Sequence, residues 1–419
     1  MHIFKVLLFI NLGLIQSQTI DSLLYNQLVE KGEWNSIYKL NIYDEYKIVE
    51  NLTILDSIYF IHQDVVKESF LKLLFRPILG LSNRNQALNE LSTIKSAYPF
   101  IDDGSSMSFA KYDKKQVAAV INFNPQFKSQ IGGILGTSKR KNGHWVTTGQ
   151  LDLHLENPRR KGLILDLNWQ QVDAYSRKFH FSMNNPFLFD LPFGTLVQFD
   201  QDFIEDSYIL ESTSGLLLGL STLGRWKFGG KTEAGKDILL NTSFNSESII
   251  IGFKADRRNN RWLPYKGLFW DVDFIFGRFQ DDANKRMILE TKFRIDQYRN
   301  IGKSVILFSS RSEHIYLEGK ELGFVKKVKF GGINSVRGYN ENQFIGDWMF
   351  VQTIEWLFGD LSLSQAFLFT DIPITKNFIY PGYGLGFRQY KGGLSLDISI
   401  GFSKQSSGGK IHIKFSSDL

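Results

Sequence analysis

The stretch Leu394–Phe402, which reads LSLDISIGF, alternates strictly between apolar residues and polar or small ones. Successive side chains of a β-strand point to opposite faces, so one face of this strand is wholly apolar and the other is not. The second face cannot form a dry core, because each unpaired polar group buried there would cost several kcal/mol. An apolar face toward lipid and a polar face toward a wet lumen are typical of a transmembrane β-barrel strand.

The same alternation recurs from Ser129 to Phe415. Segments of about ten residues are separated by polar or glycine-rich turns, and we count about sixteen of them, an even number that closes an antiparallel barrel. The longest connection, roughly 317–346, falls between the eleventh and twelfth segments. The alternation is clearest in four further stretches, namely Leu151–Glu156, Leu163–Trp169, Phe179–Asn184 and Leu268–Phe276.

The composition fits a large antiparallel barrel better than a soluble enzyme. Aromatic residues make up 14% of the 419 residues, with 36 glycines, 9 prolines and no cysteine. The absence of cysteine excludes disulfides, thiol catalysis, cysteine-bound metals and a lipoprotein anchor. The net charge of +6 is scattered, which favours contact with anionic lipid head groups over a nucleic-acid groove.

No catalytic motif stands out, and we expect no enzyme, no cofactor and no metal site. The 7 histidines are dispersed, without an H-E-x-x-H or a G-x-S-x-G motif. His154 and His180 lie on the predicted lumen face, where a barrel lipase would be the enzymatic alternative. Gly382, Gly384 and Gly386 precede no helix, so they do not form a nucleotide-binding loop.

The beginning of the chain reads as a secretory signal peptide over residues 1–18. Lys5 precedes the apolar run Val6–Ile15, which is followed by small and polar residues. That run is too short for a helical membrane span, which needs roughly 20 residues. We assign residues 19–45 to a lead-in, 46–125 to a small domain and 126–419 to the barrel.

The segment 46–125 has the order strand, helix, helix, strand, strand, which predicts a small α+β domain. The expected elements are a strand at Tyr46–Leu55, a helix within Val65–Phe75, a helix capped by Ser82, and a hairpin of Met107–Tyr112 and Gln116–Phe123.

The long connection carries the tetrapeptide Val336-Arg337-Gly338-Tyr339. It resembles the V-R-G-F/Y signature of the BamA/TamA superfamily of outer-membrane assembly and translocation barrels, also called the surface-antigen family. Four other stretches are similar to family motifs in order and spacing: Asp256–Gly267, Gln352–Trp356, Phe367–Asp371 and Gly384–Arg388.

The resemblance implies one POTRA-like periplasmic domain before a 16-stranded antiparallel transmembrane barrel. It also implies that the long loop folds back into the lumen, with Arg337 anchored by Glu355 and Asp371. Glu355 is inward by parity, whereas Asp371 shares its parity with Phe367 and Phe369. We expect the loop to have no apolar face of its own, and we expect Gly384 and Gly386 to leave room for it on the lumen wall.

A weak seam is predicted between the first and last barrel strands. Glycine has no side chain to pack and loses more entropy on ordering, so a glycine-rich first strand should pair poorly. The residues assigned to the seam are Gly132, Gly133, Gly136, Ile411, Ile413 and Phe415.

The resulting hypothesis is a Gram-negative outer-membrane factor for protein insertion or translocation, with the POTRA-like domain in the periplasm. Its expected partners are outer-membrane lipids, unfolded outer-membrane or secreted client proteins, and periplasmic or lipoprotein partners, but no nucleic acid. Clients would add a strand to a sheet edge, for which Gln116–Phe123 is the expected probe position. The alternatives are a passive pore, a surface antigen, an accessory barrel, or a secretion pore for one exoprotein.

Overall fold

A computed structural model describes residues 36–40, 46–51, 54–62, 65–81, 84–98, 100–102, 104–113, 116–139, 145–171, 175–221, 224–260, 262–281, 284–333, 335–405 and 408–418. The predicted signal peptide, residues 1–18, lies outside them. The chain divides into two compact units, Met1–Gln126 and Phe127–Leu419. Among the described residues, no helix has the length and apolarity that a membrane-spanning helix requires.

The first unit contains a three-stranded sheet and two short helices. The sheet has the order β3-β5-β4, formed by Ile54–His62, Gln116–Phe123 and Ser106–Asp113. Strand β5 is parallel to β3 and antiparallel to β4. The helices are α3 (Glu68–Leu74) and α4 (Arg84–Ala97), with the short 3-10 helix η2 (Arg76–Ile78) between them. Rings of the helical segment pack on the sheet, as in the edge-to-face contact of Phe75 with Phe123.

Two expectations about this unit are wrong in detail. The strand predicted at 46–55 is two elements: β2 (Tyr46–Asn51) pairs with β1 (Ser36–Leu40), and β3 begins only at Ile54. Strand β5 is the central strand, so both of its edges are already paired and it cannot accept a client strand. Among the described residues, the outer edges of this sheet belong to β3 and β4, and the edge of β3 is already bonded to Gly80 and Leu81 at Leu55. The expected cap of α4, Ser82, lies outside the described residues.

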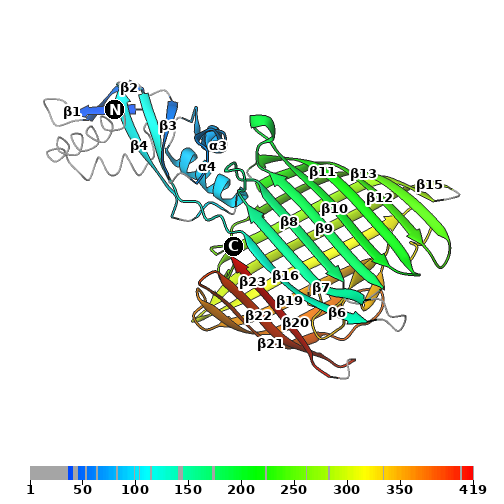
Figure 1. Ribbon diagram of the computed structural model, residues 1–419. Coiled ribbons are helices and arrows are strands. Elements are labelled where there is room, and N and C mark those ends of the chain that lie inside the picture. Colours follow the sequence, from blue (N-terminus) through cyan, green and yellow to red (C-terminus); the bar gives the residue numbers. More distant parts are fainter. Residues whose placement is uncertain are drawn as a thin grey trace. The chain divides into compact units, whose positions relative to one another are not determined.

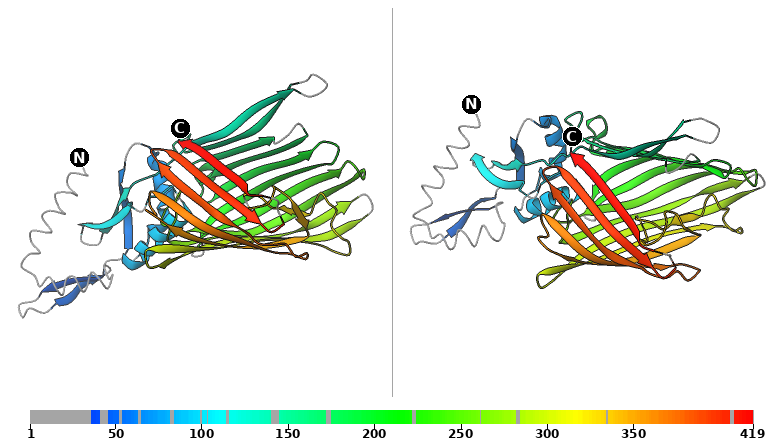
Figure 2. Two further views of the ribbon diagram at one scale, coloured as in Figure 1. Left: turned by 90° about the horizontal axis from the view of Figure 1, so that it is seen from below. Right: turned by 60° about the horizontal axis from the view of Figure 1, so that its bottom comes forward.

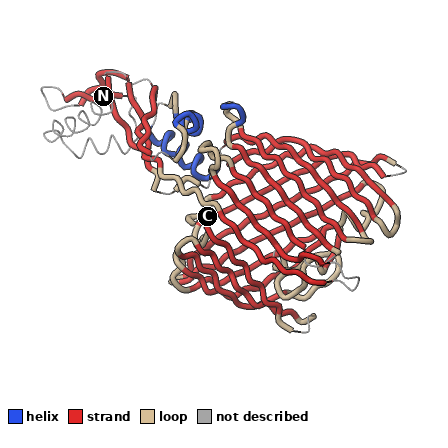
Figure 3. The backbone as a smooth tube through the Cα atoms, viewed as in Figure 1, coloured by secondary structure: helices blue, strands red, loops and turns tan. Residues whose placement is uncertain are grey.

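Sixteen antiparallel strands form a closed barrel in the second unit, as the alternation predicts (Figures 1 and 3). In chain order they are β6 (Gln130–Lys139), β7 (Trp145–Glu156), β8 (Ile164–Gln171), β9 (Ser176–Asn185), β10 (Gly194–Ile204), β11 (Tyr208–Ser221), β12 (Gly224–Asp237), β13 (Thr242–Asp256), β14 (Gly267–Asp281), β15 (Lys285–Ile301), β16 (Ser304–Leu317), β19 (Trp348–Phe358), β20 (Ser364–Ile374), β21 (Gly382–Lys391), β22 (Leu394–Ser403) and β23 (Lys410–Asp418). The turn between β9 and β10 holds the short 3-10 helix η3 (Leu188–Asp190).

The outer surface of the barrel is a belt of large apolar side chains. These include Val197, Leu217, Phe228, Ile249, Phe274, Ile295, Phe308, Trp356, Leu368 and Ile398. The inner face is only partly polar, whereas the alternation predicts a polar face toward a wet lumen. Leu216, Leu218, Ile250 and Ile275 form a buried apolar cluster on the inward positions of β11, β13 and β14.

The barrel has two rims. We call the rim where β6 begins and β23 ends the near rim, and the opposite one the far rim. The longest connection, residues 318–347, joins β16 to β19 at the far rim, between the eleventh and twelfth strands as predicted. It contains a small hairpin of β17 (Val328–Phe330) and β18 (Phe344–Gly346). We call residues 318–347 the internal loop.

The internal loop has an apolar core, contrary to expectation. Six of its side chains are buried in one cluster with residues of the barrel wall, including Tyr208, Ile288 and Met349. Burying one such side chain contributes about 1.5–3 kcal/mol, so this packing outweighs a single ion pair. The six loop residues are Leu322, Val325, Val328, Phe330, Val336 and Tyr339.

The two faces of β8 provide a test of the strand register. Leu167→Arg should destabilise the barrel by about 2–4 kcal/mol, because it puts a charge on the lipid-facing side at mid-depth. Asn168→Arg, one residue along the same strand, should be mild, because Asn168 faces a polar cavity and contacts Asp152. Reversible unfolding in lipid would measure both changes. Equal losses at the two positions would show that the register is wrong.

Candidate functional site

The V-R-G-Y motif follows a tight turn of the internal loop. Gly331 and Gly332 have φ of 120° and 85°, in the region that favours glycine. The backbone N–H of Gly331 donates to the Ser335 hydroxyl, and that of Gly332 donates to the Val336 carbonyl. The turn therefore sets the position from which the next side chain, that of Arg337, leaves the loop.

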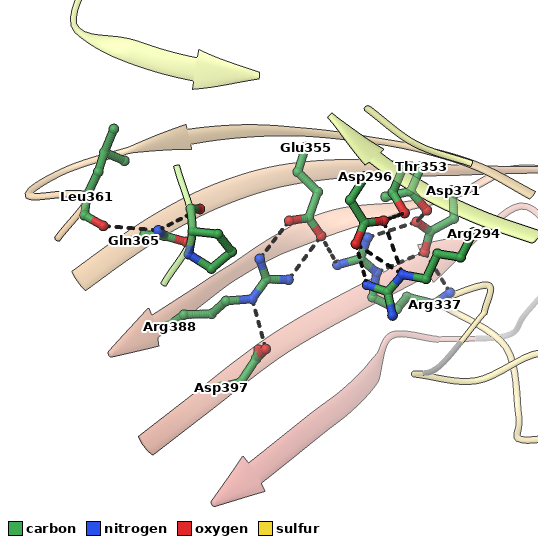
Figure 4. Close-up of polar contacts among 12 residues, drawn as sticks. Arg294, Asp296, Arg337, Thr353, Glu355, Leu361, Gln365, Asp371, Arg388 and Asp397 are labelled. Carbon is green, nitrogen blue, oxygen red and sulfur yellow. Dashed lines mark hydrogen bonds and ion pairs between the residues drawn. The ribbon is translucent and has the colours of Figure 1, made fainter. Parts of the chain in front are cut away.

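Arg337 contacts two carboxylates on neighbouring strands, and the structure thus brings the three predicted anchor residues together (Figure 4). Its Nε and Nη2 atoms donate to the Asp371 oxygens at 2.8 Å, and its Nη1 donates to Glu355 Oε1 at 2.7 Å. Its backbone N–H also donates to Asp371, at 2.9 Å. All three residues are buried, with 7% or less of their surface exposed.

The charge of the Arg337 guanidinium is held by its partners. Burial by itself lowers the pKa of this group, but Glu355 and Asp371 raise it above its usual value. A planar fork of donors suits two carboxylates at once, which a lysine ammonium could not match.

A second arginine, Arg388, belongs to the same cluster, although its sequence motif alone indicates no role in anchoring the loop. Its Nη1 and Nη2 donate to Glu355 at 2.7 and 3.0 Å, and its Nε donates to Asp397 on β22 at 2.9 Å. Ion pairs thus run from Arg337 through Glu355 and Arg388 to Asp397, across β19, β21 and β22 (Figure 4). The alternation along β21 could have indicated Arg388, since its side chain lies on the same inward face as Gly384 and Gly386.

Asp371 lies on the same face of β20 as two phenylalanines, and the structure explains why an acidic residue can share that face with them. Phe367 and Phe369 do face inward with it, and both rings are buried. The Arg337 guanidinium lies 3.6 Å from the centroid of Phe369, and that of Arg388 lies 4.1 Å from the centroid of Phe367. The aromatic rings therefore stack on the two cations inside the barrel.

The roles expected of the lumen-wall glycines need correction. A Cβ on Gly384 would meet the Ile400 carbonyl oxygen and the ring of Phe369, and one on Gly386 would meet the ring of Phe367, so these glycines make room for the neighbouring strand β22 and for the aromatic rings. The internal loop is accommodated instead by Gly382 and Gly401, where a Cβ would meet the backbone of the V-R-G-Y motif.

The other three motif residues pack the internal loop against the wall. Val336 is fully buried in the apolar cluster. Gly338, with φ of 90°, approaches the backbone of β22 so closely that a Cβ would lie 2.6 Å from the Phe402 carbonyl oxygen. The Tyr339 hydroxyl donates to the Tyr380 carbonyl at 2.8 Å.

The motif Asp256–Gly267 forms the near-rim turn between β13 and β14. The Asn259 side chain accepts hydrogen bonds from the backbone N–H groups of Tyr265 and Lys266, and that of Asn260 accepts from Trp262 and Leu263. Buried Gln365 on β20 donates to the carbonyls of Pro264 and Leu361 (Figure 4). This turn is thereby tied to the strand that carries Asp371.

The seam between β6 and β23 is short. It contains two register pairs, Gln130 with Asp418 and Ile131 with Ser417, against eight pairs between β22 and β23 and ten between β6 and β7. Figure 2 shows the red strand β23 and the teal hairpin of β6 and β7 diverging from this end.

The six residues assigned to the seam from sequence lie on the two seam strands but form none of its pairs. Gly132 begins the unpaired part, where a Cβ would lie 2.7 Å from the Phe415 carbonyl oxygen. Gly133 and Gly136 continue β6 and pair only with β7. Ile411, Ile413 and Phe415 are more than half exposed on the outer face of β23. Among the described residues, β6 and β23 therefore have no register pair with each other beyond Ile131.

No group of residues suited to holding a metal ion was found in the described part of the chain. His154 contacts the carboxylates of Asp166 and Glu156, and His180 contacts that of Asp200. Ser182 donates to Asp166.

Comparison with known proteins gives a family and a fold. The Omp85 superfamily domain matches residues 106–371, which is more than half of the chain. Among solved structures, the chain is similar to BamA from Haemophilus ducreyi lacking POTRA domains 1–3, with 14% identity, a TM-score of 0.51 and coverage of 93% of this chain and 91% of that one. No curated protein matches by sequence.

Two structures of CdiB are also similar. CdiB from Acinetobacter baumannii has 15% identity and a TM-score of 0.59, and covers 94% of this chain and 80% of its own. CdiB from Escherichia coli has 11% identity and a TM-score of 0.62, with coverage of 94% and 82%. At these identities the likeness concerns the fold.

Proposed function

This chain belongs to the Omp85 superfamily, and from that membership we propose that it is an outer-membrane barrel that inserts or translocates client proteins. The observation that carries the proposal is the seam: two register pairs close the barrel, and the rest of both strands is an open edge. An unpaired strand edge is a template for adding another strand.

The barrel wall is also shortest beside the seam. A tilted transmembrane strand needs about 9–11 residues to cross the hydrocarbon core. The seam strands β6 and β23 have 10 and 9 residues, close to this minimum, whereas β15, on the other side of the barrel ring, has 17. A wall that is shorter on the seam side favours a thinner bilayer there, which lowers the cost of passing polar backbone through it.

The internal loop argues against a passive pore. A buried apolar cluster joins six of its side chains to the wall, and a freely conducting channel has no use for such a plug. We therefore place the activity at the seam rather than along an open lumen, and we propose no enzymatic role, cofactor or metal.

The first unit, with its helices and three-stranded sheet, is proposed to be a POTRA-like domain in the periplasm. The near rim then faces the periplasm and the far rim faces the outside of the cell. The edges of β3 and β4 offer the backbone groups that an extended client segment would pair with.

Photocrosslinking in cells tests the proposal. Probes at Ser108 on the edge strand β4 and at Ile413 on the seam should capture client polypeptides. The matched controls are Asn122, exposed on the central strand β5, and Phe274, exposed in the lipid belt of β14. Many nascent barrel proteins would mean insertion, and a single exoprotein would mean secretion. Equal yields at probes and controls would overturn the proposal.

A further inference from the structure

A second cluster of buried charges holds the internal loop, 11 residues before Arg337. The Lys326 side chain is 4% exposed and its Nζ lies 2.6 Å from Glu290 Oε1 on β15. Lys326 also forms an ion pair with Glu233 on β12. No motif of the sequence marks these residues.

A wall lysine completes the cluster. Lys231 Nζ lies 2.6 Å from Glu233 Oε2 and 3.5 Å from Glu290 Oε2, so two ammonium groups alternate with two carboxylates. Both glutamates have 6% or less of their side chains exposed. Without the lysine from the loop, the two buried carboxylates would keep Lys231 as their direct ion-pair partner among the described residues, with Lys292 of β15 acting on them at longer range, and this arrangement is costly.

The wall is shaped to receive this lysine. Strands β12 and β15 are separated by β13 and β14, so Glu233 and Glu290 meet only because small residues lie between them. Ser246 and Ser248 on β13 are buried, and a Cβ on Gly277 of β14 would meet the Ser248 hydroxyl. The small residues leave the inner surface free for the two glutamates to converge on the loop.

The two charge clusters of the internal loop lie on different sectors of the barrel. Lys326 is bound to β12 and β15, whereas Arg337 is bound to β19 and β20 and, through Glu355 and Arg388, reaches Asp397 on β22. Asp397 is the register partner of Lys414 on the seam strand β23.

We propose that Lys326, with Glu233 and Glu290, is a second anchor that makes the internal loop a two-ended tether between the β12–β15 wall and the seam-side strands β19–β22. Lys326 is thus a positioning residue: it acts through the loop and not on a client. The inference concerns where the loop is held, so it can be tested without any client and stands apart from the proposed function.

The test uses the full-length protein in lipid, with loop release read as the rate of thermolysin cleavage between Phe324 and Phe330 and as channel conductance. Lys326→Met should raise the cleavage rate on the order of 100-fold, since one partner of a buried ion pair is lost. Lys327→Met is the matched control: the neighbouring lysine is 29% exposed and pairs within the loop with Asp347. It should behave as wild type.

Two further variants distinguish the effect of losing the anchor from the effect of losing charge balance in the cluster. Lys326→Met with Glu290→Gln restores neutrality but lacks the tether, so we expect it to recover thermal stability and to stay cleavable. Glu290→Gln alone keeps the Lys326–Glu233 pair and should be intermediate, which covers the case in which Lys326→Met fails to fold. Wild-type cleavage and conductance in a folded Lys326→Met protein, or a return of both to wild type in the neutral double variant, would overturn the proposal.

Discussion

A disulfide between Ile131→Cys and Ser417→Cys should abolish client handling while the barrel stays folded. These two positions form one of the two register pairs that close the seam. Paired positions on antiparallel strands have the Cα separation of roughly 4.4–6.8 Å that a disulfide needs. Because the chain contains no cysteine, only the engineered pair can oxidise.

The expected loss follows from the geometry of the seam. Beyond Ile131 the edges of β6 and β23 are already unpaired, so separation of the two register pairs is the step that frees both strands. A covalent bond at that point blocks this step without changing any other strand pair. Activity should fall to background on oxidation and return on reduction, measured as insertion or translocation by the same sample in both states.

The control is a disulfide that does not cross the seam. Ile131 is also the register partner of Leu153 on β7, so Ile131→Cys with Leu153→Cys places the same chemistry on the other side of β6. That bond should leave activity intact. Full activity of the oxidised Ile131–Ser417 protein would mean that the seam does not open, and a passive or lumenal route would then be favoured.

The barrel could be predicted from the sequence because its strands obey a local rule. Alternation with period two is visible within any ten residues, and the long connection interrupts it at one place. The strands of the first unit are harder to predict. The break between Asn51 and Ile54 separates two sheets, but no glycine or proline in the sequence marks that break. Only the pairing partners of β2 and β3 reveal it.

The sequence predicts the part of the site whose residues belong to a family motif. It does not predict the part in which residues far apart in the sequence contact one another. Arg337, Glu355 and Asp371 were found by resemblance and parity. Lys326 was not, because a loop lysine looks solvated until Glu233 and Glu290, from separate strands, are seen to enclose it. The seam register likewise joins the two ends of the barrel sequence, and no local pattern encodes it.

Replacement of Arg337 by alanine should destabilise the folded protein by about 3–5 kcal/mol, because it leaves buried carboxylates without their partner. Glu355 and Asp371 are 2% and 1% exposed, so in the folded protein the guanidinium groups, and not water, stabilise their charges. After the change, Arg388 is the remaining cation for Glu355, whereas Asp371 keeps the Thr353 hydroxyl and the backbone N–H of residue 337, neither of which carries a charge. Carboxylates held this way repel one another, and the wall at β19 and β20 should loosen.

The internal loop should nevertheless stay in the lumen of the Arg337→Ala protein. Its apolar cluster and the Lys326 ion pairs are untouched, so the change should be confined to the segment from Gly331 to Tyr339. Protease sensitivity should rise there and not between Phe324 and Phe330. Activity should be lost, because that segment connects the loop to the strands next to the seam.

Two companion variants define what the arginine contributes. Arg337→Lys should rescue poorly, since one ammonium cannot donate to both oxygens of Asp371 and to Glu355 in a single plane. Arg337→Met with Asp371→Asn removes the buried charge imbalance, and we expect it to regain stability in reversible unfolding without regaining activity. Wild-type activity in Arg337→Ala, or full rescue by lysine, would contradict the anchoring role. If the neutral double variant regained both stability and activity, Arg337 would be only a counter-ion for Asp371. A residue that positions the loop could not be made dispensable by removing the charge that it faces.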